Sequence, residues 1–422
     1  MTHKPKQIND PVHGLITLDG RLFQLIDTPE YQRLRDIKQL GGACYVFPGT
    51  SHSRFEHGIG TAHVSTKWFD HLIKTTPHFF NPTYRFYVQV AGLCHDLGHG
   101  PFSHLFEKFL NQLSPELKKE WHHENMSCII LKQIVSNNPQ INLDSDALKI
   151  INAMILGEKL PNLPSFLFQI VHNKTFEIDA DKFDYLQRDC KSAGLPIGVD
   201  CNRIIEMSRL TTEGQIEFPL KESYLIVQLF AFRYSMYKQV YYHPVSGAIE
   251  LMIKDILMEN DFNFNKLKEG INPDTLDWYL KLTDSVLNEV ERKNPSSLLM
   301  MRLRYRNLYK LSNHFIIKQE ASEEEIDYMV KKFETKETHV VYIKRNWCKG
   351  KSNPLENVTF FPNPANLLAV DSLMPAHYQE RVVRVYAKDS SRVKEIASVI
   401  NDSVDDKMSA IIGAIGQTKQ FI

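Results

Sequence analysis

The chain lacks the features that mark several specialised classes of protein. Its 422 residues carry 50 Lys and Arg against 50 Asp and Glu, so it has no basic surplus of the kind that proteins coating nucleic acid use. No apolar run approaches the ~18 residues of a membrane span, and the mean hydropathy is −0.31. The first residues are polar and hold no signal-peptide core. These absences predict a soluble, unexported protein inside the cell, in the cytoplasm or the nucleus.

The cysteines also lack a pattern. The chain has 6 of them, scattered and with no CxxC pair. Zinc ribbons and disulfide frameworks both need paired or regularly spaced cysteines, so the sequence excludes these scaffolds. We expect most of the thiols to be small buried side chains in a reducing compartment.

Most of the chain up to residue 330 has the apolar spacing of helices. Residues 84–97 predict a buried helix that ends at Gly98, because glycine commonly terminates helices. Residues 274–290 predict another single helix. We therefore expect a large helical domain over residues 1–330.

The remaining residues have a different composition. Residues 338–343 and 381–386 are rich in β-branched and aromatic side chains, which favours strands. An amphipathic helix is expected over residues 391–401, packed on these strands. The predicted fold class is therefore mainly α, with a small α+β lobe over residues 331–422.

Histidine, by contrast, is concentrated in one part of the chain. Eight of the 17 His lie within residues 52–104, far more than an even spread would place there. The segment His95–His104 combines three His with Asp96 at a predicted helix end and a Gly/Pro turn, where glycine allows close backbone approach. A single His is most often structural, but this cluster predicts a functional site.

A metal-binding site needs more ligands than His95 and Asp96. Imidazole and carboxylate together suit Zn, Fe, Mn or Mg ions. His57 lies on a predicted upstream helix, and Asp181 lies on a third helix downstream. Because metal sites in helical proteins take ligands from separate helices, we predict that these four residues bind one divalent cation.

The spacing of His57, the His95-Asp96 pair and Asp181 resembles the H…HD…D signature of the HD-domain phosphohydrolases. Longer strings are more specific, and they resemble the SAM- and HD-domain deoxynucleoside triphosphate triphosphohydrolases of animals. The strings are Lys38–Gly42, Tyr45–Gly49, Ser51–His57, Ala91–His104 and Asp181–Cys190. The likeness runs from Lys6 to Lys388. No SAM domain precedes it, so we expect a catalytic core alone.

Hydrolysis of a phosphate ester needs an activated water, positive charge on the phosphate and a proton for the leaving oxygen. The resemblance implies Fe, Zn or Mn at the HD site, with Mg, and triphosphate binding by Arg54, Lys182 and Tyr185. His104 is the expected general acid, because histidine can give up a proton near neutral pH. The other catalytic positions implied by the resemblance are His99, His123 and Glu107.

Two of these positions depart from the animal pattern. His123 follows His122, where the family has a single His, so the register between the two is open. Glu107 stands where the animal enzymes have Asp. Its carboxylate either orients a histidine or is a solvated charge on a helix.

The resemblance also implies the substrate. Gln39 and Leu40 would hold the sugar 3′-hydroxyl and crowd out a 2′-hydroxyl, Asp189 would accept a hydrogen bond from the sugar, and Tyr241 would close the pocket. An unpaired buried hydroxyl costs about 1–3 kcal/mol, so such a wall discriminates against ribonucleotides. The implied reaction cleaves a dNTP at the α-phosphate and gives deoxynucleoside and tripolyphosphate.

The resembled enzymes are regulated by nucleotides. The resemblance implies that GTP and dNTP bind between subunits and drive assembly of a homo-oligomer, a dimer or a tetramer. Pro219 and Pro244 depart from the family's Arg and Lys in this region. The positions that match are Lys6, Asn9, Asp27, Gln32, Arg35, Arg203, Lys221, His243, Arg384 and Lys388.

Two other functions stay open. One is an HD hydrolase of nucleoside monophosphates or guanosine polyphosphates, although the triphosphate-binding set counts against it. The other is a non-catalytic nucleic-acid-binding protein that uses local basic patches at Lys344-Arg345 and Lys349–Lys351, although the zero net charge counts against it. Nucleic acid is therefore not a required partner. The products of dNTP hydrolysis distinguish these alternatives.

Overall fold

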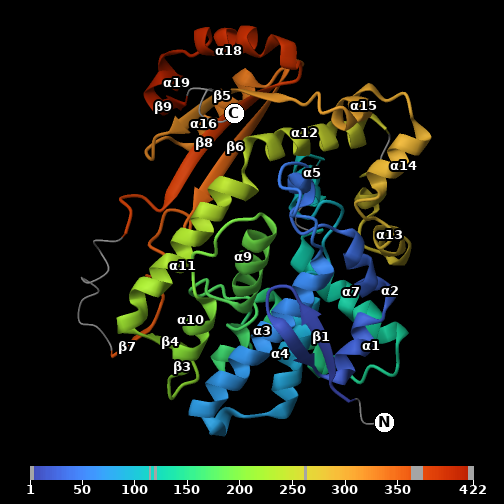
Figure 1. Cartoon of the computed structure of the whole chain (residues 1–422), viewed down its shortest axis with the longest axis vertical. Helices are drawn as coiled ribbons and strands as arrows, with labels where there is room; N and C mark the ends of the chain where they lie inside the picture. The colour runs from blue at the N-terminus through green and yellow to red at the C-terminus, as the bar shows by residue number, and fades with distance from the viewer. Residues whose placement is uncertain (1–3, 114–115, 118–120, 261–263, 363–373, 417–422) are drawn as a thin grey trace. The chain divides into compact units, whose positions relative to one another are not determined.

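The computed structural model describes residues 4–113, 116–117, 121–260, 264–362 and 374–416 (Figure 1). The chain forms two compact units. Unit 1 comprises Met1–Arg233, Asn263–Val286 and Pro354–Met374, and unit 2 comprises Tyr234–Phe262, Leu287–Asn353 and Pro375–Ile422. Unit 2 includes elements from before residue 330, among them helix α12 (Pro244–Glu259) and strand β5 (Lys310–Ile317), which pack on each other. The domain assignment to residues 1–330 and 331–422 stays a prediction.

Unit 1 is organised around helix α3 (Arg54–Thr75), which packs against α4 (Pro82–Cys94) and α9 (Ala180–Ser192). A capping box between Ser53 and Glu56 fixes the start of α3. Most side chains of α3 are buried, as expected for a helix enclosed by its neighbours. Further helices are α1 (Phe23–Ile26), α2 (Pro29–Gln32), α5 (His104–Leu113), α7 (His123–Asn137), α8 (Ser145–Leu156), α10 (Cys201–Met207), α11 (Ser223–Met236) and α13 (Pro273–Tyr279).

Two small sheets accompany these helices, and neither was predicted. Strands β1 (Lys6–Asp10) and β2 (Gly14–Leu18) form an antiparallel hairpin. Strands β3 (Arg209–Leu210), β4 (Ile216–Pro219) and β7 (Phe360–Phe361) form the second sheet in the order β3-β4-β7. The strands are too short to show a clear alternation of apolar residues.

Unit 2 contains an antiparallel sheet in the order β6-β8-β5-β9. Its strands β6 (Thr338–Asn346) and β8 (Gln379–Ala387) confirm the two predicted strands, whereas β5 and β9 (Ile412–Gly416) were missed. Phe315, Val383 and Val385 face a core that α16 (Glu323–Phe333), α18 (Val393–Asp402) and α19 (Asp406–Ile411) complete. Unit 2 also holds α15 (Leu298–Arg304), and α14 (Val286–Lys293) begins at the unit boundary.

Two predicted helices differ from those in the structure. The helix expected over residues 84–97 ends at Cys94, so His95 and Asp96 lie just beyond it. The helix expected over residues 274–290 is two helices, α13 and α14. The Asp284 carboxylate between them accepts hydrogen bonds from two backbone amides, at 3.0 Å and 2.6 Å, and these contacts hold the segment between α13 and α14 in place. The predicted mainly-α fold class is confirmed.

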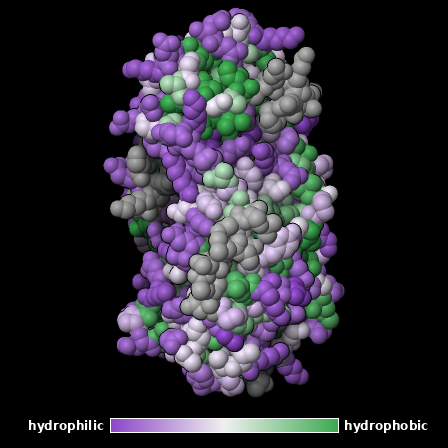
Figure 2. Space-filling view, turned by 90° about the vertical axis from the view of Figure 1, so that its left-hand side faces the viewer, coloured by the Kyte–Doolittle hydropathy of each residue, from purple (hydrophilic) through white to green (hydrophobic). Residues whose placement is uncertain are grey.

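The surface of unit 2 exposes some apolar residues. Figure 2 shows apolar side chains gathered on one part of the surface. Ile415 on the edge strand β9 is 56% exposed. Among the described residues, no helix is both long enough and apolar enough to cross a membrane.

Candidate active site

The four predicted metal ligands come from three segments of unit 1 and lie together. His57 lies near the start of α3, Asp181 lies in the first turn of α9, and His95 and Asp96 follow the end of α4. The Nε2 atom of His57 is 3.2 Å from His95 Nε2 and 3.4 Å from Asp96 Oδ2. It is 3.0 Å from Asp181 Oδ1. We call these four residues the inner cluster.

Both imidazoles of the inner cluster present the same nitrogen to its centre. The Nδ1 atom of His57 is 2.7 Å from Asp184 Oδ2, and that of His95 is 2.8 Å from the Gly92 carbonyl. Each ring is thereby held with Nε2 facing the other ligands, as in protein metal sites. His57, His95 and Asp96 are buried, and their ligand atoms lie within 4.8 Å of one another. Two imidazoles with two carboxylates fit a divalent transition metal.

The carboxylates around His57 favour its charged form. Burial alone would lower the pKa of His57, but hydrogen bonds to Asp181 and Asp184 raise it to about 10. Burial opposes ionisation of Asp181, yet hydrogen bonds with His57 and His95 hold its pKa well below the usual value. A metal-bound imidazole is neutral, so cation binding at His57 Nε2 would release a proton.

Four more predicted residues form an outer cluster, consisting of His99, His104, Glu107 and His123. Their ligand atoms also lie within 4.8 Å of one another. The rings of His99 and His123 stack with centroids 4.1 Å apart. The Glu107 carboxylate contacts Nδ1 of His123 and lies 3.2 Å from Nδ1 of His104. His122 instead pairs with Glu124, so the geometry places His123 rather than His122 in the cluster.

Asp96 and Arg54 connect the two clusters. The Nη1 atom of Arg54 donates to Asp96 Oδ2 at 2.6 Å, and Asp96 Oδ1 is 3.3 Å from His99 Nε2. Burial opposes ionisation of Asp96, but Arg54 and the neighbouring histidines hold its pKa well below the usual value. Burial and the charge of Arg54 hold the pKa of His99 well below its usual value. The two clusters thus share one ionised carboxylate.

Comparison with known proteins fits this geometry. The HD domain family matches residues 54–189, which span the inner and outer clusters. The deoxynucleoside triphosphate triphosphohydrolase SAMHD1 homolog of Dictyostelium discoideum is 33% identical, over 93% of this chain and 79% of its own length. The human deoxynucleoside triphosphate triphosphohydrolase SAMHD1 is 32% identical, over 92% of this chain and 71% of its own. This chain belongs to the SAMHD1-type family of HD-domain deoxynucleoside triphosphate triphosphohydrolases.

A viral protein is similar over a smaller region. The putative HD domain-containing protein L394 of Acanthamoeba polyphaga mimivirus is 33% identical, over 66% of this chain and 62% of its own length. Membership of the SAMHD1-type family confirms the resemblance drawn from the sequence strings.

Three of the substrate positions predicted for this SAMHD1-type chain, Gln39, Leu40 and Tyr241, lie outside α9 and in different units. Gln39 is buried, and its side-chain oxygen has no hydrogen-bond partner among the described residues. Its backbone carbonyl accepts from Arg54 Nη2 at 3.3 Å. Leu40 is half-buried beside it. Tyr241 belongs to unit 2, where its ring lies 5.0 Å from that of Tyr237.

The other substrate positions lie on α9. The Lys182 ammonium is 2.8 Å from Asp179 and 3.2 Å from Glu177. The Tyr185 ring lies 6.5 Å from the ring of His57. Asp189 is buried and is 2.7 Å from Nε2 of His52. Helix α9 therefore carries a predicted metal ligand and all three of these positions.

The predicted regulatory positions are divided between the units. Seven lie in unit 1. There the Lys6 ammonium sits 4.1 Å from the Phe23 ring centre, and Arg35 donates to Gln32 at 2.7 Å. Arg203 pairs with Glu222. The others in unit 1 are Asn9 on β1, Asp27 after α1 and the exposed Lys221.

The remaining three regulatory positions lie in unit 2. His243 caps α12, and Lys388 lies 3.9 Å from Asp255. Arg384 is buried and donates to the Tyr242 carbonyl at 2.6 Å. Pro244, which departs from the family pattern, is the first residue of α12.

A group of residues behind His57 was missed by the sequence analysis. Asp184 and Arg188 follow Asp181 on α9 by three and seven positions, a spacing that could have indicated a shared buried face. Asp10 and His13 come from the β1–β2 hairpin and had no local signal.

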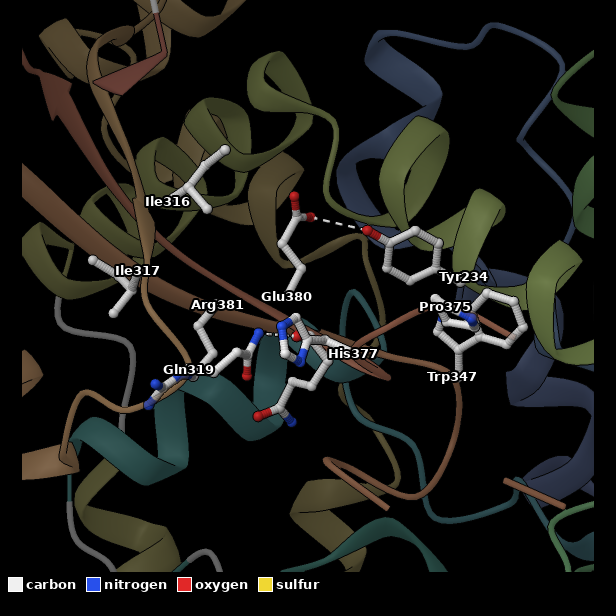
Figure 3. Close-up of a pocket in the computed structure, with 10 residues that line it drawn as sticks. Tyr234, Ile316, Ile317, Gln319, Trp347, Pro375, His377, Glu380 and Arg381 are labelled. Carbon is white, nitrogen blue, oxygen red and sulfur yellow. Dashed lines mark hydrogen bonds between the residues drawn. The ribbon is translucent and has the colours of Figure 1, made fainter. Parts of the chain in front are cut away.

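Unit 2 contains a separate pocket with a volume of about 300 Å³. Figure 3 shows the hydroxyl of Tyr234 donating a hydrogen bond to Glu380, with Trp347 and Pro375 nearby. The residues that line it include none of the predicted site positions. It therefore contributes nothing to the site proposed for the family reaction.

Proposed function

We propose that this SAMHD1-type enzyme cleaves dNTPs at the α-phosphate and releases deoxynucleoside and tripolyphosphate. The observation that supports this reaction most strongly is the contact between the two clusters. Asp96 belongs to the inner cluster and lies 3.3 Å from His99 of the outer cluster. A cation-binding set and a proton-donating set therefore stand close enough to act on one phosphate ester.

The inner cluster would hold the cation through His57 Nε2, His95 Nε2, Asp96 and Asp181. A bound divalent cation supplies Lewis acidity and lowers the pKa of a coordinated water toward neutrality. We propose Fe, Zn or Mn at this position, with Mg. The inward Nε2 atoms and the Nδ1 bonds behind them support that assignment.

The outer cluster supplies the proton for the 5′-oxygen of the leaving deoxynucleoside. The side chain of His104 is 61% exposed, so its ring is open to a ligand. Glu107 bonds Nδ1 of His104, which leaves Nε2 to donate the proton. Glu107 is therefore the residue that orients the acid. The rings of His99 and His123 pack against the ring of His104. Such a positioned acid increases the rate of reaction by about 10²–10⁴-fold.

We propose that Arg54, which bonds Asp96, binds the triphosphate together with Lys182 and Tyr185 of the helix that carries Asp181. For the sugar, the unpartnered buried oxygen of Gln39 supports a hydrogen bond from the 3′-hydroxyl. Leu40 would exclude a 2′-hydroxyl, since a buried hydroxyl without a partner is costly. Asp189 and Tyr241 are the remaining proposed sugar contacts.

Product analysis tests the reaction. The protein is incubated with each dNTP and with Mn²⁺, Mg²⁺ or Fe²⁺, with and without GTP, and products are separated by ion-exchange chromatography. Tripolyphosphate and deoxynucleoside in equal amounts are the expected products. Release of orthophosphate or pyrophosphate would instead support one of the other HD hydrolase classes. His95→Ala protein is the control for a contaminating phosphatase.

Regulation by nucleotides is a separate part of the proposal. GTP and dNTP would bind at the ten regulatory positions and drive assembly of a dimer or a tetramer. The cations among them support binding of phosphate groups. Mass in solution with and without GTP plus dNTP tests this assembly, and an unchanged mass would contradict it.

A further inference from the structure

Asp184 lies directly behind the inner cluster and is fully buried. Its Oδ2 atom is 2.7 Å from Nδ1 of His57. Asp181, three residues earlier on α9, is 3.0 Å from the other ring nitrogen of His57. The imidazole is thus held between two carboxylates of one helix. The Asp184 contact fixes which nitrogen faces the cluster, as carboxylates behind metal-bound histidines do.

Asp184 is itself held by residues from two parts of the chain. Arg188 forms a two-pronged contact with it, through Nε at 2.8 Å and Nη2 at 2.9 Å. The Nε2 atom of His13 lies 2.6 Å from its Oδ1 atom. Arg188 Nη2 also donates to Asp10 Oδ2 at 3.0 Å. Two of the groups that fix Asp184 and its arginine therefore come from the β1–β2 hairpin.

The hairpin turn is built to present these two side chains. Asp10 Oδ1 accepts the backbone amides of Val12 at 2.8 Å and His13 at 2.9 Å. Asp10 is 7% exposed, so its second oxygen reaches Arg188 in a buried setting. The hairpin strand β2 packs on α3 (Figure 1).

Helix α3 has a glycine, Gly60, at the position where Asp184 and Arg188 pack against it. A Cβ atom at Gly60 would lie 1.9 Å from Asp184 Oδ1 and 2.4 Å from Arg188 Nη2. Any larger side chain would displace the carboxylate and the guanidinium. Buried charges need such complete pairing, because removing one partner leaves the other uncompensated.

We propose that the β1–β2 hairpin is part of the metal site, because its His13 holds the carboxylate that orients His57 and its Asp10 holds the arginine paired with that carboxylate. The proposal rests on cation binding by the inner cluster. Docking of the hairpin then sets the cation affinity, although no hairpin residue is a ligand. By thermodynamic reciprocity, cation binding also stabilises the docked hairpin. Asp10, His13, Asp184 and Arg188 are positioning residues.

Asp10→Asn is the variant that tests the hairpin contact. The amide oxygen of Asn can still accept the two backbone amides of the turn, so the substitution removes mainly the charge opposite Arg188. Mn²⁺ affinity is measured by calorimetry on the full chain without nucleotides. We expect a loss of up to about 10-fold, at the low end of the effect of a residue bonded to a metal ligand, because Asp10 acts on His57 only through Arg188 and Asp184. Unchanged affinity would overturn the proposal.

Asp19→Asn is the matched control. Asp19 follows the same hairpin and pairs with the exposed Arg21 at 2.7 Å. The substitution therefore removes one negative charge near the hairpin without changing any contact of Asp184. Its Mn²⁺ affinity should equal that of the parent. Co²⁺ gives a second readout, because its visible absorption reports ligand geometry. The spectrum should change in Asp10→Asn and not in Asp19→Asn.

A measurement on the parent protein avoids dependence on a variant that fails to fold. Hydrogen exchange of residues 6–18 is compared with and without Mn²⁺. We expect slower exchange in the hairpin when Mn²⁺ is bound, and equal exchange would overturn the proposal. If the parent binds no Mn²⁺, the metal site itself is wrong. If the parent binds Mn²⁺ and hydrolyses dNTPs while Asp10→Asn behaves identically, only the hairpin proposal fails.

Discussion

The inner and outer clusters of unit 1 use the same side chain in two different settings. In the inner cluster, each histidine has Nδ1 bonded from behind and Nε2 turned inward, and Asp96, Asp181 and Asp184 surround the pair. In the outer cluster, two of the three histidines share one carboxylate, Glu107, and the side chain of His104 is 61% exposed. The number of carboxylates and the access to solvent thus distinguish the cluster proposed to hold a cation from the cluster proposed to supply a proton.

The largest expected effect comes from breaking the inner cluster. His95→Ala removes an inward nitrogen, and its turnover of dNTPs should fall more than 100-fold, beyond the usual 10–100-fold effect of residues that only support ligands. Turnover is followed through tripolyphosphate release, and a circular dichroism spectrum checks the helical fold. Near-parental turnover by the folded variant would contradict the ligand assignment.

Breaking the outer cluster should have a different result. His104→Ala removes the proposed proton donor, so turnover should fall by about 10²–10⁴. Mn²⁺ should raise the melting temperature of His104→Ala as much as that of the parent, because His104 is outside the inner cluster. A His104→Ala enzyme with the parental rate would show that another group donates the proton.

The Glu107–His123 pair predicts a pH dependence of stability. Burial alone would lower the pKa of His123, but the charge and hydrogen bond of Glu107 raise it to about 9. A raised folded-state pKa stabilises the fold fully below the unfolded value of about 6.5, and this stabilisation is lost as pH rises toward 9. Glu107→Gln removes the pair.

The measurement for this pair is the free energy of unfolding of parent and Glu107→Gln between pH 6 and pH 10. At pH 6 the parent should be more stable, by on the order of 1–3 kcal/mol. The difference should shrink as His123 loses its proton. A difference that is constant over this range would mean that His123 is not charged by Glu107.

The smallest effect on stability and turnover is expected for a substitution of His122, the residue before His123. His122 pairs with Glu124 and is outside the outer cluster. His122→Ala removes its partly exposed pair with Glu124, so it should lower stability by no more than about 1 kcal/mol, and it should leave turnover near the parental rate. His123→Ala, measured beside it, should lose much more activity. The reverse order would place His122 in the site.

The residues predicted as metal ligands carry a recognisable spacing, and their role as ligands stays a prediction. His57, His95-Asp96 and Asp181 stand in separate helical segments, and the fold brings them together as expected. The outer cluster was predicted from the same strings, and the structure adds that Glu107 contacts two histidines. Here the chemistry is encoded locally, in short segments.

Long-range contacts were harder to predict. Strand β5 pairs with β9, about one hundred positions later in the chain, and no local pattern indicated that pairing. The contact between His13 and Asp184 joins residues 171 positions apart. The helix expected over residues 274–290 is interrupted between α13 and α14, where Asp284 bonds the amides of Lys38 and Phe102. Each of these features depends on partners that the local sequence does not identify.

The division of labour between the two clusters is tested most directly by Mn²⁺ binding to two variants. Calorimetric titrations of parent, His95→Ala and His104→Ala are compared at one pH without nucleotide. We predict that His95→Ala loses Mn²⁺ binding and that His104→Ala binds Mn²⁺ as the parent does. Equal loss in both variants, or retention in His95→Ala, would contradict it.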